Sequence, residues 1–313
     1  MWNGRIDGTN DGDMRFHQMV RFDKSKLLNI NESAFTIIGF ASDEGVRRNK
    51  GRVGAKFGPD EIRKQLAKLP FHFPKEVKLF DFGNVCCVDG LLEKAQKEIG
   101  EKIYELLTNH HIPIVLGGGH ETLYGHYLGV RQFLGPDQKI GIINIDAHFD
   151  LRKMDIPSSG TMFRQILEQD LNAGYLCIGV QRLGNTKSLF DAADQLGCEY
   201  LMAEKVHLMN MDSVFQKIDD FAKPYDKLIF TLCMDVIEAS SAPGVSAPTP
   251  LGLDPKNVRE ILKHIAAHPK SMSFDISEVN PEVDENGKTS RLAAYLVAET
   301  LDGFFAKKIK RNY

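Results

Sequence analysis

The sequence of 313 residues contains a single tryptophan, only five cysteines and no long apolar run. No stretch approaches the roughly 18–20 uninterrupted apolar residues that a membrane-spanning helix requires. The first residues, MWNGRIDGTNDGDMRF, contain no apolar segment of the kind found in secretory signals. The cysteines are sparse and odd in number, which argues against a disulfide framework. We therefore expect a cytoplasmic protein that does not enter a membrane.

The charge of the chain is nearly balanced, with 39 Lys and Arg residues against 42 Asp and Glu residues. The formal net charge of −3 provides no electrostatic footprint for nucleic acid or for an anionic membrane surface. No repeat, low-complexity tract or Pro/Ser-rich linker divides the sequence. We therefore expect a single domain over residues 1–313, in which residues 1–34 form an N-terminal extension that packs onto the domain or is partly disordered.

Short apolar runs alternate with longer amphipathic segments along the chain. Strands are predicted at residues 35–40, 77–83, 112–118, 140–146, 175–180, 198–203, 228–235 and 271–276. Helices are predicted near residues 59–68, 91–108, 121–134, 161–170, 188–196, 212–222, 255–267 and 291–306. Most of the strands are apolar on both alternating faces, which is typical of a parallel sheet covered on both sides. The pattern predicts an α/β fold, and periodicity alone does not decide between a closed barrel and an open sheet.

Unusual polar residues follow two of these strands directly. The run IPIVL leads into GGGHE, which places His120 at the start of the next helix. The run IGIIN leads into Asp146, His148 and Asp150, whose spacing of two lets them converge on one point. Two carboxylates and an imidazole packed together require a neutralising cation, and a divalent metal suits such ligands. The alternatives are a glycine-rich turn with a capping Glu121 and a solvated polar loop.

Two further strand ends carry similar chemistry. Cys233 and Asp235 end the run LIFTL and precede a loop rich in turn-forming Pro, Gly and Ser. Glu278 ends the run FDIS shortly before a proline. Each acid taken singly is compatible with a helix cap or a solvated turn. Because ligands in α/β proteins bind at the carboxyl ends of the strands, the four motifs together predict a site for two metal ions.

These motifs resemble, in order and spacing, those of the ureohydrolases, a family that includes arginase, agmatinase and formimidoylglutamase. The resemblance rests on GGGHE, NIDAHFDLR, the strand–APG–TP loop and FDISEVNP, and it extends from about residue 35 to the final helix. It implies a three-layer α/β/α fold with an eight-stranded parallel sheet, and a centre of two Mn2+ ions that hydrolyses a C–N bond of a guanidine or an amidine. We also expect a homo-oligomer that acts on a small molecule.

The resemblance also implies the metal ligands. It assigns His120 and Asp150 to one manganese ion, His148 to the other, and Asp146 to a bridging position between them. The family carries two aspartates separated by one residue in its third metal motif, whereas this chain has Cys233 in the first position and Asp235 in the second. Three carboxylates and a thiolate still balance two divalent cations, so Cys233 is included among the expected ligands. Sulfur is softer than manganese prefers, which makes another metal or a weaker affinity possible at this site.

Two further stretches resemble formimidoylglutamases, namely GVRRNKGRVGA from residue 45 and SSGTMFRQ from residue 158. N-formimidoyl-L-glutamate has a cationic amidine at one end and two carboxylates at the other. We expect Glu278 to pair with the amidine, arginines to bind the carboxylates, and Ser159 to be a further substrate-binding residue. The candidate arginines are Arg47, Arg48, Arg52, Arg164 and Arg182, and we assign Arg48, Arg52 and Arg164.

The implied reaction is hydrolysis to L-glutamate and formamide, the last step of one route of histidine breakdown. Asp150 is the expected proton carrier and Glu278 the other catalytic residue. The alternatives are an agmatinase or guanidinobutyrase, whose substrates lack the dicarboxylate, and a metal-free relative without catalytic activity.

Overall fold

One parallel sheet organises the protein. The computed structural model describes residues 1–23, 34–74 and 76–311. Its sheet has the order β1-β3-β2-β4-β9-β8-β5-β6-β7, and every pairing between these strands is parallel. The strands are β1 (Val20–Arg21), β2 (Phe35–Ala41), β3 (Leu79–Cys86), β4 (Ile112–Gly117), β5 (Ile140–Ile145), β6 (Ala173–Val180), β7 (Glu199–Met202), β8 (Lys227–Cys233) and β9 (Ser271–Ser277).

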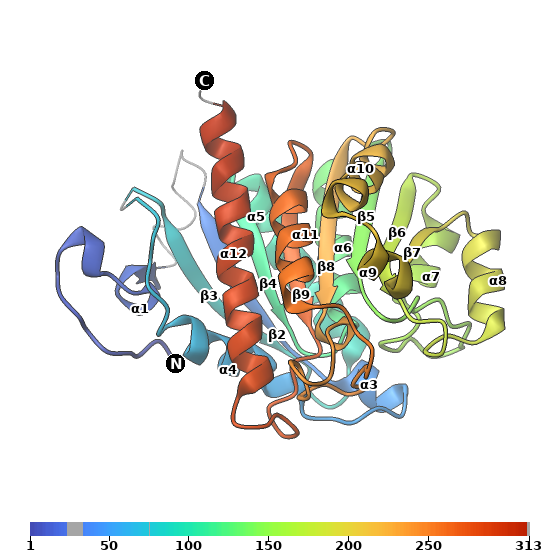
Figure 1. Cartoon of the computed structure of the whole chain (residues 1–313), viewed down its shortest axis with the longest axis horizontal. Coiled ribbons are helices and arrows are strands. Elements are labelled where there is room, and N and C mark those ends of the chain that lie inside the picture. Colours follow the sequence, from blue (N-terminus) through green and yellow to red (C-terminus); the bar gives the residue numbers. More distant parts are fainter. Residues whose placement is uncertain (24–33, 75, 312–313) are drawn as a thin grey trace.

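Helices cover both faces of this sheet, with α10, α11 and α12 on one face and α5 and α6 on the other (Figure 1). The α-helices are α1 (Phe16–Met19), α3 (Glu44–Arg48), α4 (Gly58–Leu66), α5 (Leu92–Thr108), α6 (Thr122–Leu134), α7 (Met162–Gln169), α8 (Lys187–Gln195), α9 (Ala203–Leu208), α10 (Met211–Ala222), α11 (Pro255–Ala267) and α12 (Lys288–Arg311). Short 3-10 turns span Asp11–Asp13, Ala55–Phe57 and Met234–Val236. Among the described residues, no helix is both long enough and apolar enough to cross a membrane.

The two sides of each central strand pack into different hydrophobic cores. Ile114 and Ile143 contribute to the core that also contains Phe304 of α12. Their chain neighbours Val115 and Ile142 contribute to the opposite core under α5, α6 and α7. This arrangement explains why the strands are apolar at consecutive positions. The three-layer α/β/α fold is therefore confirmed, and the open sheet excludes the barrel.

The observed elements correspond closely to the predicted ones, and the sheet has one strand more than the predicted eight. All eight predicted strands and all eight predicted helices are present. The strand β1 and the helices α1, α3 and α9 were not predicted, because segments of two to six residues are too short to show a period.

Residues near the N-terminus pack against the β3 edge of the sheet. The strand β1 pairs with β3, and Trp2 Nε1 donates a hydrogen bond to Asp81 Oδ2 at 2.5 Å. Asp81 also forms a buried ion pair with Arg63, whose side chain is fully enclosed. These contacts hold residues of the predicted extension on the domain, and residues 24–33 of that extension lie outside the described residues.

The four motifs singled out in the sequence follow four adjacent strands. The strands β4, β9, β8 and β5 are neighbours in the sheet, although β4 and β5 are consecutive along the chain and diverge to either side of β9 and β8. Because all four are parallel, their carboxyl ends lie at one edge. The topology therefore brings the residues after β4, β5, β8 and β9 to one place.

Candidate metal centre

A pocket at the carboxyl ends of the central strands holds most of the predicted site residues. The predicted residues that line it are His120, His148, Asp150, Ser159, Cys233, Asp235 and Glu278. Asp146 lies beneath them and has no exposed surface. The structure thus brings together the expected metal ligands and two of the expected substrate-binding residues.

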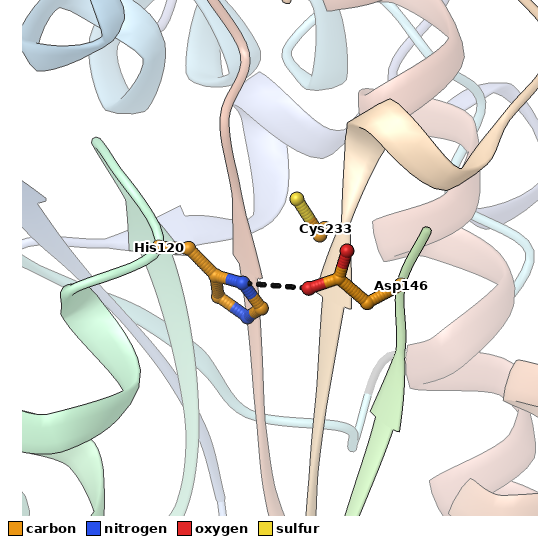
Figure 2. Close-up of side chains that lie close together, drawn as sticks. All are labelled: His120, Asp146 and Cys233. Atoms are coloured by element: carbon orange, nitrogen blue, oxygen red, sulfur yellow. Dashed lines mark ion pairs between the residues drawn. The ribbon is translucent and has the colours of Figure 1, made fainter. Parts of the chain in front are cut away.

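His120 forms the centre of one group of potential ligands. Its Nδ1 lies 3.0 Å from Asp146 Oδ2 and 3.1 Å from Asp150 Oδ2. His120, Asp146 and Cys233 each offer a ligand atom, and these three atoms lie within 4.8 Å of one another (Figure 2). The backbone N–H of His120 donates to Glu278 Oε1 at 2.9 Å, which ties this group to the end of β9.

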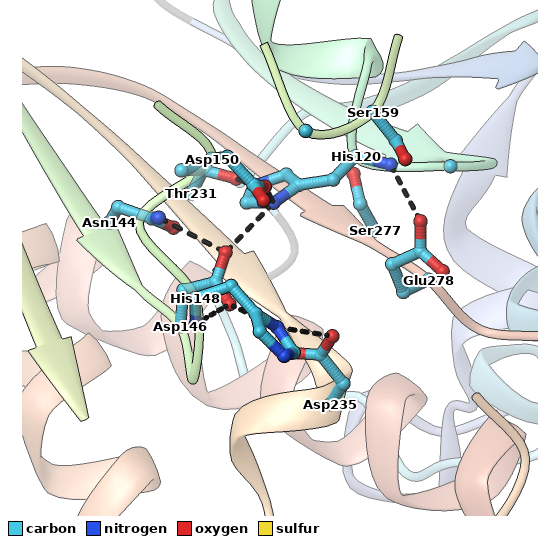
Figure 3. A network of polar contacts seen from close by, with 12 residues as sticks. His120, Asn144, Asp146, His148, Asp150, Ser159, Thr231, Asp235, Ser277 and Glu278 are labelled. Atoms are coloured by element: carbon cyan, nitrogen blue, oxygen red, sulfur yellow. Dashed lines mark hydrogen bonds and ion pairs between the residues drawn. The ribbon is translucent and has the colours of Figure 1, made fainter. Parts of the chain in front are cut away.

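Asp146 also belongs to a second group, with His148 and Asp235. Ligand atoms of these three residues lie within 4.8 Å of one another. His148 Nδ1 is 3.2 Å from Asp235 Oδ2 and 3.6 Å from Asp146 Oδ1 (Figure 3). Since Asp146 directs one oxygen toward each histidine, its position is that of a carboxylate between two cation sites.

Cys233 and Asp235 both face the pocket, as their spacing predicted. Cys233 ends β8, and Asp235 lies in the 3-10 turn that follows. Burial raises the pKa of the Cys233 thiol well above its usual value, and the nearby charges of Asp146, Asp235 and Glu278 raise it further. The thiol is therefore protonated unless a cation binds beside it.

The electrostatics of the pocket indicate a surplus of negative charge. Burial and the charge of Asp146 raise the pKa of Asp150 to about 6. Burial and the charge of Asp235 raise the pKa of Glu278 to about 8. Burial opposes protonation of His120, but its hydrogen bonds with Asp146 and Asp150 outweigh burial and raise its pKa well above the usual value. Each group thus favours the protonation state that reduces the negative charge.

Two carboxylate oxygens in this pocket remain without partners. Asp235 Oδ1 and Glu278 Oε2 are buried and accept no hydrogen bond within the described part of the chain. Buried, unpaired acceptors are costly, and a cation or a cationic substrate would satisfy them. The mixture of carboxylate, imidazole and thiol donors fits divalent transition metals. The residues present are therefore compatible with the two metal ions expected from the sequence.

The backbone at two site residues adopts the left-handed conformation, which non-glycine residues rarely adopt. Asp150 has φ of 50° and Glu278 has φ of 70°. The Glu278 N–H donates to Gly118 O at 2.7 Å, so this conformation is held by the glycine-rich loop. A side chain at Gly118 would meet the carbonyl oxygen of Ser42 at 1.8 Å. Gly118 therefore lets the segments around Ser42 and Glu278 pack closely against the glycine-rich loop, and this packing directs Glu278 into the pocket.

Glu121 does not cap α6, which was the alternative explanation of GGGHE. Its side chain makes no capping hydrogen bond. Instead, Oε1 accepts hydrogen bonds from the N–H of Gly45 at 2.9 Å and from Ser42 Oγ at 3.0 Å. Glu121 thus fixes the segment that leads from β2 to the pocket.

The expected substrate-binding arginines are engaged elsewhere. Arg48 pairs with Glu44 at 2.9 Å and with Glu93 at 2.5 Å. Arg164 pairs with Glu168 at 2.7 Å. Arg52 donates to the carbonyl oxygens of Val245 and Ser246, and so holds two loops together. Arg47 and Arg182 also lie outside the pocket lining. This placement does not support the prediction that Arg48, Arg52 or Arg164 binds substrate.

Arg152 is the cationic side chain that does line the pocket. It makes no ion pair within the described residues, and the absence of a side chain at Gly160 leaves room for its stem. Asn49 lines the same side of the pocket beside Ser159. Sequence reasoning missed Arg152, although its position two residues after Asp150 in NIDAHFDLR was a usable signal.

The sequence is similar to known proteins over almost its whole length. Residues 33–302 match the family model described as the arginase family. Formimidoylglutamase of Geobacillus sp. (strain WCH70) is 52% identical over 310 residues, which cover 98% of this chain and 95% of the relative. Formimidoylglutamase of Clostridium tetani is 43% identical over 96% of this chain and 93% of the relative.

Solved structures show the same fold. Formimidoylglutamase from Bacillus subtilis superposes with a TM-score of 0.84 over 96% of both chains at 22% identity. Trypanosoma cruzi formiminoglutamase, solved with Mn2+, superposes with a TM-score of 0.79 over 90% of this chain and 97% of that one, at 26% identity. Because the family model spans most of the sequence and the relatives match almost end to end, the chain belongs to the arginase family.

Proposed function

We propose that this protein hydrolyses N-formimidoyl-L-glutamate to L-glutamate and formamide with two manganese ions. The residues that line one pocket support this function most directly. It combines a cation-demanding cluster, an unpaired oxygen of Glu278 and an unpaired arginine, Arg152. The high identity to proteins named formimidoylglutamase supports the substrate. The manganese in the related Trypanosoma cruzi structure supports the metal.

Two groups of side chains would hold the metal ions. His120, Asp150 and Cys233 would hold one ion, His148 and Asp235 the other, and Asp146 would contact both. When bound, the cations would lower the pKa of a water molecule so that hydroxide is available near neutral pH. They would also neutralise Asp150 and Asp235, whose pKa values are raised by burial and by the charge of Asp146.

Glu278 and Arg152 would orient the substrate between them. The Oε2 atom of Glu278 is buried in the pocket lining and has no partner among the described residues, so it would pair with the amidinium group. Arg152 is exposed at the mouth and would pair with the carboxylates through its planar guanidinium. Asn49 and Ser159 would add an amide and a hydroxyl donor beside it. Glu278 would bind the cationic group and Arg152 the anionic groups, which matches the charges of formimidoyl-glutamate.

Asp150 would transfer the proton during hydrolysis. Its carboxylate lies beside His120 at the pocket wall. A C–O bond forms between water and the amidine carbon, and Asp150 accepts the proton of the water. The C–N bond to the glutamate nitrogen then breaks, and Asp150 returns the proton to that nitrogen. The products are L-glutamate, released as the amine, and formamide. We assign this reaction to histidine breakdown in the cytoplasm, in a homo-oligomer.

The first prediction concerns substrate choice. Protein supplied with Mn2+ should release formamide and glutamate from N-formimidoyl-L-glutamate, because the pocket offers partners for both its ends. Urea release from agmatine or arginine should be at least about 100-fold slower in kcat/KM, since neither supplies a dicarboxylate to Arg152. Faster hydrolysis of agmatine than of formimidoyl-glutamate would contradict the proposal and favour an agmatinase.

The second prediction concerns Arg152. Arg152→Met should raise KM for formimidoyl-glutamate roughly 10- to 100-fold, as expected for the loss of a charged hydrogen bond to substrate. Formimidoyl-glycine, which lacks the second carboxylate, should be a poor substrate of the unaltered protein. Arg164→Met is the matched control, because Arg164 already pairs with Glu168, and its KM should stay near that of the unaltered protein. A larger effect of Arg164→Met than of Arg152→Met would reverse the assignment.

The third prediction concerns Cys233. Cys233→Ser should weaken metal retention and lower turnover, because only a thiolate binds metal strongly and a serine hydroxyl of similar size does not. Metal content after dialysis and kcat are the measurements. Cys198→Ser, at a half-buried thiol outside the pocket lining, is the control. If Cys233→Ser retains two metal ions and normal turnover, the thiol does not bind metal.

A further inference from the structure

A buried carboxylate under the pocket has no role in the reaction described above. Asp275 lies in the middle of β9 and has no exposed surface. Its Oδ1 accepts hydrogen bonds from Thr231 Oγ at 2.6 Å and from Ser277 Oγ at 3.4 Å. Its Oδ2 lies 2.7 Å from His126 Nδ1, and His126 Nε2 lies 2.6 Å from Ser273 Oγ. Burial of a carboxylate in a central strand is energetically unfavourable, so the presence of Asp275 at this position suggests a function.

The hydrogen bonds of His126, Asp275 and Thr231 form a network that ends at His120, a predicted metal ligand. Thr231 Oγ lies 3.0 Å from Nε2 of His120, on the side of the imidazole away from Asp146 and Asp150. A hydroxyl has one proton, and Thr231 donates it to Asp275. The lone pairs of the hydroxyl are therefore left to face His120, so Nε2 of His120 must be the donor in this contact. Consequently Nδ1, which points at Asp146 and Asp150, is the nitrogen that can give up its proton and offer a lone pair to a metal.

We infer that Thr231, Asp275 and His126 are positioning residues that keep Nε2 of His120 protonated and direct its Nδ1 toward the metal centre. The inference rests on the proposed function, because it assumes that His120 binds metal. Asp275 fixes the direction of the Thr231 hydroxyl. His126 fixes Asp275 in turn, because a carboxylate oxygen accepts and Nδ1 of His126 must donate to it. An imidazole set in this way binds a metal without reorienting, because only the proton on Nδ1 has to leave.

The placement of these residues supports a role in positioning rather than in packing. Asn144, Thr231 and Asp275 are aligned across β5, β8 and β9. Asn144 positions Asp146 in the same way, since its Nδ2 donates a hydrogen bond to Asp146 Oδ2 at 3.1 Å. His120 and Asp146 are therefore each held by a hydrogen bond with a residue of this row. Three apolar side chains would pack at these positions without burying polar groups, but they would leave His120 Nε2 unpaired.

The experiment measures Mn2+ affinity in the absence of substrate. Thr231→Val keeps the shape of the side chain but removes the hydroxyl, and Asp275→Asn removes the charge that orients it. Both variants should bind Mn2+ about 10- to 100-fold more weakly, the usual effect of losing a partner of a metal ligand. Thr231→Ser restores the hydroxyl and should return the affinity to within about threefold of the unaltered protein. Isothermal titration with Mn2+ gives the dissociation constants.

A matched control separates positioning from general stability. Thr36 Oγ lies 2.6 Å from His111 Nδ1 in another buried Thr–His contact, near the amino ends of the strands. Thr36→Val should lower the thermal midpoint of the metal-free protein as much as Thr231→Val does, and it should leave Mn2+ affinity unchanged. If Thr231→Val and Thr36→Val weaken Mn2+ binding equally, the network is only structural and the inference is overturned.

His126→Gln provides a milder test, because three hydrogen bonds, through Asp275 and Thr231, separate His126 from His120. Its effect on Mn2+ affinity should have the same sign as that of Asp275→Asn, and the double variant should lose less than the product of the two single effects. Unchanged affinity in the folded His126→Gln, Asp275→Asn and Thr231→Val variants would overturn the inference and leave the proposed function intact. Failure of the unaltered protein to bind Mn2+ would instead contradict the metal centre itself.

Discussion

Four carboxylates are buried at one edge of the sheet, and the surrounding residues must neutralise their charge. Asp146, Asp150, Asp235 and Glu278 lie together at the ends of three neighbouring strands, β5, β8 and β9. Within the described residues, His120 and His148 form the ion pairs of the three aspartates. Without a cation, burial and mutual repulsion raise the pKa of Asp150 to about 6 and that of Glu278 to about 8. The glycine-rich loop and the left-handed residues hold these groups in an arrangement that repulsion alone would disperse.

Because alternate residues of a strand face the same side, successive positions on one face of the sheet form an apolar layer, a polar layer and the candidate site. On the face under α5, α6 and α7, β5 and β8 begin with apolar side chains such as Ile142 and Ile229. Two residues further, the polar row of Asn144, Thr231 and Asp275 crosses three strands. Two residues further again, Asp146 and Cys233 face the centre. The opposite face remains apolar throughout, so the same strands build a core on one side and a site on the other.

Much of this organisation could be predicted from the sequence, because it depends on local periodicity and on strand ends. The long strands are apolar at consecutive positions, and the predicted ligands follow them directly. What could not be predicted depends on contacts between distant segments. Arg48 was expected to meet substrate, but Glu93, 45 residues away, is its partner. Thr231 and Asp275 occur within predicted strands, yet their support of His120 depends on which strands are neighbours in the sheet.

Anomalous diffraction from crystals loaded with Mn2+ would show directly whether cations bind among the buried carboxylates. If cations neutralise the buried carboxylates, two peaks per chain should occur in the pocket, one beside His120 and one beside His148, with Asp146 in contact with both. Cys233 should lie within bonding distance of at least one of them. A single peak outside this pocket, or none at saturating Mn2+, would contradict the account.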